Sequence, residues 1–175
     1  MEESRGLSVG RGRWGFLGQV SDLELAYAAF RITLGVNIFF HGTMRLITGL
    51  DAWVVMQAKV FEGNPLLPMW AVLAFLYVLP FVEAILGFLT ALGLFTRWAL
   101  LAGSAMIFWL VFGNLTRQDW GTVGNNMHYV LYYSLMIAGL RFNCFALDTL
   151  RAPSESARHA EVPAAGRPRS TRGIA

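Results

Sequence analysis

The most constraining feature of the sequence is an apolar run from Trp70 to Phe95, in which Glu83 is the only acidic or basic residue. A helix of about 20 apolar residues covers the hydrocarbon core of a bilayer, so this run is long enough to cross one. A carboxylate inside such a helix is costly unless it is compensated, and intramembrane charged residues usually mark functional sites. The run therefore predicts a membrane helix that carries a functional carboxylate.

Composition supports a membrane protein. Of the 175 residues, 55% are hydrophobic and 14% are charged, whereas a soluble domain carries about 25% charged residues. The length fits one helical bundle with tails and leaves no room for a second catalytic domain. The net charge of +3 comes largely from arginines in the tails and predicts no nucleic-acid binding. Cys144 is the only cysteine, which excludes an internal disulfide, a CxxC redox pair and a Cys-based metal cluster within one chain.

Four apolar segments predict an all-α integral membrane protein, a bundle of four transmembrane helices. The predicted spans are residues 23–47, 70–95, 98–115 and 125–144. A short amphipathic helix is expected at residues 52–62 on the extracytoplasmic side. Its apolar stripe would be Trp53, Met56 and Val60, at helical spacing, with Asp51 placed to cap it. This helix is too short to cross a bilayer.

The chain is accordingly divided into a tail at residues 1–22, a membrane domain at 23–147 and a disordered basic tail at 148–175. Four spans put both tails and the turn at Arg97 on one side of the membrane, together with most of the arginines. The other side has Lys59 and Arg117, with Arg45 at its rim. Because Lys and Arg gather on the cytoplasmic side, both termini are predicted to be cytoplasmic.

Each predicted span contributes polar groups to the middle or outer half of the bundle, given a helical rise of about 1.5 Å per residue. A proton or anion site is predicted from Glu83, His41 and Arg31, with a set of residues that bind the substrate around it: Tyr132, His128, Asn114, Asn37 and Arg45. On the first span, Arg31, His41 and Arg45 share a face. On the second span, Gly87 follows Glu83 by one turn and predicts the close approach of another helix.

The predicted partner of Glu83 is Arg31, because a carboxylate and a guanidinium in the membrane compensate each other. Side chains lean toward the N-terminus of their helix, which would widen this gap and leaves His41 or Tyr132 as alternatives. Arg31 could also extend to the cytoplasmic interface, and Arg45 is expected to extend to the outer one.

Several motifs in their order and spacing resemble the DoxX family of small four-helix membrane proteins. They are Arg31-x3-Gly35, His41-Gly42, Glu83-x3-Gly87 and Leu92-Gly-Leu-Phe-Thr-Arg97, and the resemblance covers Ala29 to Leu147. It implies a multi-pass protein of the bacterial inner (cytoplasmic) membrane. One branch of the family, DoxD, is the membrane subunit of a thiosulfate:quinone oxidoreductase and works beside a separate DoxA subunit. Other members are linked to oxidative-stress and thiol-redox complexes.

The expected function is therefore that of a membrane subunit in a quinone-linked redox complex, with ubiquinone or menaquinone as the bound cofactor and no covalently bound group or metal. Electrons would come from a soluble or membrane redox partner, because the sequence has no flavin or iron–sulfur motif. The other expected partners are the lipid bilayer and a second copy of the chain. Whether the chain is an enzyme is left open. The alternatives are a non-catalytic anchor, scaffold or small-molecule conduit, and a b-type haem held by His41 and His128.

Overall fold

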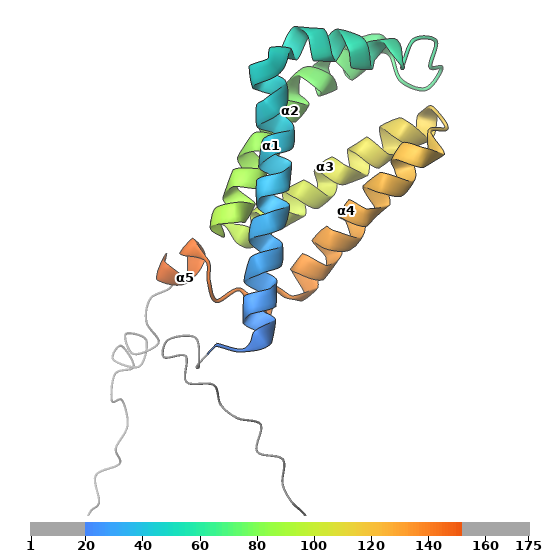
Figure 1. Ribbon diagram of the computed structural model, residues 1–175. Coiled ribbons are helices and arrows are strands. Elements are labelled where there is room, and N and C mark those ends of the chain that lie inside the picture. Colours follow the sequence, from blue (N-terminus) through green and yellow to red (C-terminus); the bar gives the residue numbers. More distant parts are fainter. Residues whose placement is uncertain (1–19, 152–175) are drawn as a thin grey trace, which may run out of the picture.

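The computed structural model describes residues 20–151, and every regular element in this part of the chain is helical (Figure 1). The elements are α1 (Asp22–Lys59), α2 (Met69–Leu92), α3 (Thr96–Thr116), α4 (Trp120–Ala138), the 3-10 turn η2 (Leu140–Phe142) and the short α5 (Leu147–Arg151). Three of them, α1, α2 and α3, are long and apolar enough to cross a membrane. The predicted all-α class is confirmed at this level. Most of both predicted tails, residues 1–19 and 152–175, lies outside the described residues.

Helix α1 begins at a capping box. The Glu24 amide donates a hydrogen bond of 3.3 Å to the Ser21 hydroxyl, and the Ser21 amide donates one of 2.9 Å to the Glu24 carboxylate. The helix is interrupted at Gly49, whose φ of +122° is a conformation that glycine adopts without strain. The chain then turns and crosses the end of the bundle as a second helical piece, which we call the roof segment (residues 50–59) (Figure 1). It corresponds to the short helix predicted at residues 52–62.

The predicted apolar stripe of the roof segment is wrong. Val54 and Ala58, one turn apart, are buried against the first turns of α2, while Trp53 is half-buried beside them. Met56 and Val60 of the predicted stripe are 57% and 48% exposed. The start of α2 lies under the segment and decides which face is covered.

Helices α1 and α2 pack at backbone contact. A Cβ atom on Gly42 would lie 2.2 Å from the Pro80 carbonyl oxygen, and one on Gly87 would lie 2.2 Å from the Phe39 amide nitrogen. Any larger residue at either position would force the helices apart, as at other small-residue interfaces in membranes. The close approach predicted at Gly87 is confirmed, and Gly42 is its counterpart beside Glu83.

The remaining helices form a second hairpin. Helix α3 packs mainly on α4, where a Cβ atom on Gly103 would lie 2.4 Å from the ring of the buried Tyr133. Helix α2 packs on α3, whereas α1 contacts α4 only sparsely. Towards the roof segment the α3–α4 hairpin leans away from α1 (Figure 1). The two hairpins are thus joined at the end near η2 and diverge at the other end.

The bounds of the fourth helix differ from the prediction of 125–144. Helix α4 starts at Trp120, because the Asp119 carboxylate accepts a hydrogen bond of 3.1 Å from the Thr122 amide and caps the helix. It ends at Ala138, and Gly139 leads into η2. The bounds of this helix are therefore set by a polar capping residue before its start and by a glycine after its end, and not by hydropathy.

The outer faces of the first three helices are apolar. Large side chains that point away from the bundle are between 45% and 71% exposed, among them Ile32, Ile85, Phe88, Trp98 and Phe108. An apolar surface of this extent is typical of contact with lipid or with other membrane helices. Together with the length of α1, α2 and α3, it indicates a membrane protein.

Candidate functional site

The Glu83 carboxylate lies in the interior between α1 and α2. The residue is 4% exposed and sits on α2 opposite Gly42 of α1, where a Cβ atom would lie 2.9 Å from the Glu83 Cβ. A larger residue at position 42 would displace the acid. The glycine therefore brings the α1 backbone alongside the carboxylate and fixes which α1 side chains can reach it.

The partner of Glu83 is Arg45. Its Nη1 atom donates a hydrogen bond to Glu83 Oε2 within an ion pair, and the two side chains are 23% and 5% exposed. The guanidinium carbon of Arg45 also lies 4.5 Å from the ring centroid of Trp53 in a cation–π contact. Trp53 belongs to the roof segment, so the turn at Gly49 places the ring over the arginine.

The prediction that Arg31 is the partner of Glu83 is wrong. Arg31 is 1% exposed, and its Nη1 donates hydrogen bonds of 2.8 Å to the carbonyl oxygens of Thr90 and Ala91, while Nη2 donates one of 2.6 Å to the Phe145 carbonyl oxygen. It therefore caps the last turn of α2 and ties down the segment after η2. The prediction that Arg45 extends to the outer interface is also wrong. Arg31 leans towards the start of α1 and away from Glu83, whereas the same lean brings Arg45 towards it.

The end of the domain opposite the roof segment is closed by hydrogen bonds between residues that are far apart in the sequence. The Asp148 carboxylate accepts hydrogen bonds of 2.7 Å from the amides of Phe95 and Thr96, at the start of α3. The Cys144 thiol donates to the Glu24 carboxylate over 3.0 Å, and this contact raises the pKa of Cys144. A thiol held in this way is less nucleophilic at neutral pH. These residues serve the fold rather than the site around Glu83.

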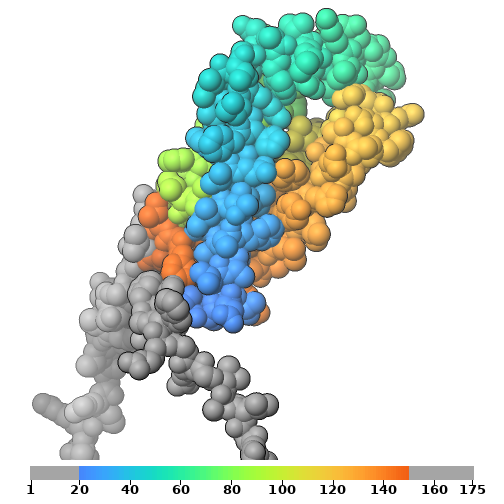
Figure 2. All heavy atoms as spheres, viewed as in Figure 1, coloured from blue at the N-terminus to red at the C-terminus, as the bar shows by residue number. Residues whose placement is uncertain are grey.

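The ion pair lines a cavity of about 620 Å³ under the roof segment, between the two diverging hairpins. Most of the wall is apolar and comes from Ile38, Phe75, Leu76, Leu79, Ile107 and Leu110. The polar part of the inner wall is Glu83, Arg45 and His41. This volume and this mixture of apolar lining with a few polar groups are typical of small-molecule sites. Figure 2 shows the surface hollowed between α1, the roof segment and the α3–α4 end.

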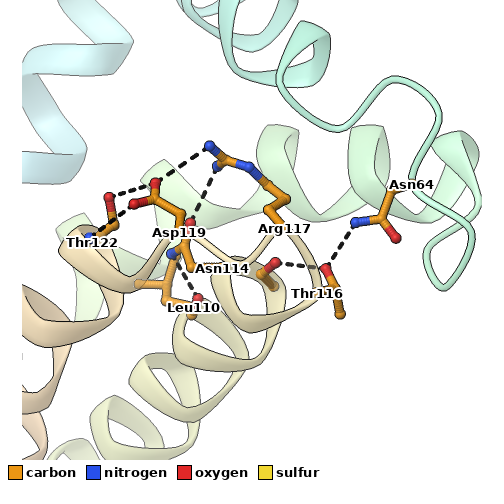
Figure 3. Close-up of polar contacts among 8 residues, drawn as sticks. Asn64, Leu110, Asn114, Thr116, Arg117, Asp119 and Thr122 are labelled. Atoms are coloured by element: carbon orange, nitrogen blue, oxygen red, sulfur yellow. Dashed lines mark hydrogen bonds and ion pairs between the residues drawn. The ribbon is translucent and has the colours of Figure 1, made fainter.

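At the outer end of the cavity, Arg117 joins three elements. It donates hydrogen bonds of 3.2 Å to Asn114 Oδ1 and 3.4 Å to Asp119 Oδ2 (Figure 3). Its guanidinium carbon also lies 4.8 Å from the Phe61 ring centroid. The hydrogen bond from the Thr122 amide holds the pKa of Asp119 below its usual range, so the carboxylate stays charged beside Arg117. Asn114, a predicted site residue, does line the cavity, but its side chain is engaged here.

The other residues of this outer cluster, Arg117, Asp119 and Phe61, were not predicted as part of the site. Their sequence signal is the Arg117-x-Asp119 pair within a short polar loop, which we read only as a connection between spans. A neighbouring hydrogen bond of 2.9 Å from Asn64 Nδ2 to Thr116 Oγ1 ties the loop before α2 to the end of α3 (Figure 3). Trp53 was likewise missed, because a tryptophan near a membrane surface is usually an interfacial residue.

On the side of the cavity towards α4, the predicted residues Asn37 and His41 lie on the exposed face of α1. The Tyr129 hydroxyl of α4 donates a hydrogen bond of 3.3 Å to Asn37 Oδ1. His41 lines the large cavity and also a shallower one of about 450 Å³ on the surface of α1.

Two predicted residues on α4 lie away from the large cavity. Tyr132 packs edge-on against Phe30 at a centroid distance of 5.5 Å, and His128 is exposed with its ring 6.5 Å from that of Tyr132. Tyr129 lines the cavity in their place. The haem alternative needs two histidines that face one space, and of the histidines in residues 20–151 only His41 lines this cavity.

The cavity thus combines an apolar interior with a compensated Arg45–Glu83 pair, a histidine at its side and a polar outer end. Comparisons with known protein families, with curated proteins and with solved structures give no match.

Proposed function

We propose that the chain is a DoxX-like membrane subunit of a quinone-linked redox complex in the bacterial inner membrane, and that it binds the quinone head group in the cavity beside Glu83. The observation that carries the proposal is the buried Arg45–Glu83 pair, with His41 beside it, on the wall of an apolar cavity of about 620 Å³. The motifs around Arg31, Glu83 and Arg97 that resemble the DoxX family support the same assignment.

In this proposal α4 is the fourth transmembrane helix and completes a four-helix bundle. Its 19 residues rise about 28 Å, close to the hydrocarbon thickness of a bilayer. The exposed Arg97 and Arg141 lie near the η2 end, and Lys59 and Arg117 lie towards the roof end. With the tail arginines counted, the excess of positive charge is at the η2 end, which supports cytoplasmic termini and an extracytoplasmic cavity.

The residues of the cavity suit a neutral quinone. Reduction of a quinone to its quinol takes two electrons and two protons, and the electrons would come from a partner protein that carries a redox centre. His41 is the group of the inner wall that can pass protons to a ring in the cavity, and Glu83, which is ionised in its pair with Arg45, can do so only after it takes up a proton from the solvent. Arg45, fixed by Glu83 and Trp53, would donate a hydrogen bond to a quinone oxygen and stabilise the negative charge that builds up there. Arg45 thus takes the role at the anion site that was expected for Arg31.

The test is quinone binding by the purified full-length protein in lipid nanodiscs. Ubiquinone and menaquinone are added at known mole fractions, and the amount retained on the protein is measured by chromatography. Glu83→Gln and His41→Gln should weaken retention, and Glu83→Gln should leave the helical content unchanged. Glu62→Gln removes an exposed carboxylate outside the cavity and is the matched control. If the wild-type protein retains no more quinone than empty nanodiscs do, the proposal is wrong.

The non-catalytic alternative makes a different prediction. In a scaffold or anchor, Glu83→Gln would change assembly with partner proteins and would leave quinone retention unchanged, because wild type and variant would both retain none. A conduit needs a path through the domain, but the half of the bundle away from the roof segment is packed by Tyr27, Leu34, Leu100, Tyr133 and Met136, all at most 7% exposed. This packing favours a cavity closed at its inner end.

A further inference from the structure

We propose that the hydrophobic tail of the bound quinone leaves the cavity sideways, between α1 and α4 past His41 and Met44, and that the ligand is therefore a long-tailed quinone taken from the bilayer. This inference rests on the proposed function and adds to it the position of the tail and the route by which the quinone enters. Three features of the described residues support it.

The first feature is a second cavity on the lateral face of α1. It has a volume of about 450 Å³ and is lined by Asn37, Phe40, His41, Met44 and Arg45. His41 and Arg45 also line the large cavity, so the two cavities lie on either side of these side chains. A head group beside Arg45 and a tail over Phe40 and Met44 would occupy both.

The second feature is the loose contact between α1 and α4. The two helices touch sparsely, and the hydrogen bond of 3.3 Å from Tyr129 to Asn37 joins them. Beyond this bond the hairpins diverge, and Figure 2 shows an opening bounded by α1, the roof segment and the α3–α4 end. Phe40 and Met44 of the lateral cavity are 53% and 48% exposed, which gives a flexible apolar tail an apolar surface.

The third feature is the charge balance of the cavity. Arg45 is already paired with Glu83 and Arg117 with Asp119, so the polar walls have no uncompensated positive charge to bind a phosphate. A phospholipid head group would bring its negative charge into an apolar space without a partner, which is costly. A quinone is neutral and needs only hydrogen-bond donors for its oxygens. The geometry therefore favours a neutral head group over a phospholipid.

The test compares a long-tailed ubiquinone with the tailless ubiquinone head group, each measured by retention on full-length protein in nanodiscs. Met44→Trp fills the lateral cavity and leaves both members of the Arg45–Glu83 pair in place. We expect it to weaken retention of the long-tailed ubiquinone by about tenfold, and that of the head group by less than about twofold. Ile32→Trp is the matched control, since Ile32 is 45% exposed on α1 and lines neither cavity.

A second measurement does not depend on a substitution. A ubiquinone with a photoreactive azide on the first isoprenoid unit of its tail should label Phe40 or Met44 in the wild-type protein, as read by mass spectrometry of the peptides. Labelling of the outer loop around Arg117 instead would overturn the lateral route.

The outcomes separate this inference from the proposed function. If Glu83→Gln weakens retention of both quinones while Met44→Trp weakens both equally or neither, the head-group site stands and the lateral route is wrong. If the wild-type protein retains neither quinone, the proposed function fails, and the lateral route fails with it.

Discussion

The Arg45–Glu83 pair gives the sharpest test of the site. Removing Arg45 leaves a carboxylate that is 4% exposed without its cation. Stranding one member of a buried pair costs about 3–5 kcal/mol. The cation–π contact with Trp53 adds about 0.5–2 kcal/mol to the loss. The Arg45 side chain is still 23% exposed. We therefore expect Arg45→Met to lower the free energy of unfolding by about 3 kcal/mol, the lower end of the range for a buried pair.

The coupling between the two residues is measured with a double-mutant cycle. Glu83→Gln keeps the shape of the side chain and should cost about 1–2 kcal/mol, because Arg45 can still reach water. In Arg45→Met/Glu83→Gln neither charge remains, so the double variant should cost about 2 kcal/mol less than the sum of the single variants. The free energy of unfolding is obtained from titration with sodium dodecyl sulfate in mixed micelles, followed by far-UV circular dichroism.

The control is the cycle of Arg117→Met and Asp119→Asn. This ion pair is longer, at 3.4 Å, and its side chains are 21% and 32% exposed. Its coupling should stay below about 1 kcal/mol, as for other solvent-accessible pairs. A coupling for Arg45 and Glu83 that is no larger than this control would refute the argument that the two charges compensate each other in the interior.

Three further changes test how the site is held in place. Gly42→Ala puts a methyl group against the Pro80 carbonyl and should cost about 1–3 kcal/mol of unfolding free energy in the same titration. Arg31→Met removes the hydrogen bonds from Arg31 to three carbonyl groups, and we expect faster amide hydrogen exchange in residues 140–149, as measured by mass spectrometry. Asp119→Asn should remove a pH dependence of stability. The lowered pKa of this carboxyl means that its contribution is complete above about pH 4 and is lost as the pH falls through its folded value.

Each of these changes has a control. Gly124→Ala adds a methyl group where no atom lies within 4 Å and should cost little, so an equal cost at Gly42 would contradict close packing there. Arg97→Met removes an exposed arginine outside this segment and should leave exchange in residues 140–149 unchanged. For Asp119, wild type and variant are compared at pH 6 and pH 3. If their difference in unfolding free energy is the same at both values, the capping role is wrong.

Much of the site was visible in the sequence, but its pairing was not. The apolar lengths predicted membrane helices, the lone carboxylate predicted a site at Glu83, and the glycine one turn after it predicted the close contact with α1. The partner was mistaken because Arg31 and Arg45 share a face of α1, so the helical period cannot separate them. The choice of Arg45 depends on the positions of α1 and α2 relative to each other along the membrane normal. Positions estimated from the sequence are uncertain by the same amount as the predicted helix ends.

The sequence by itself determined that this chain forms apolar helices with one carboxylate among them, since length and hydropathy are local properties. The tertiary structure decided what surrounds that carboxylate. The turn at Gly49 brings Trp53 over Arg45, Gly42 admits α1 to the side of Glu83, and the two hairpins diverge enough to leave the cavity. These contacts join residues from separate helices, and their geometry depends on how the helices pack.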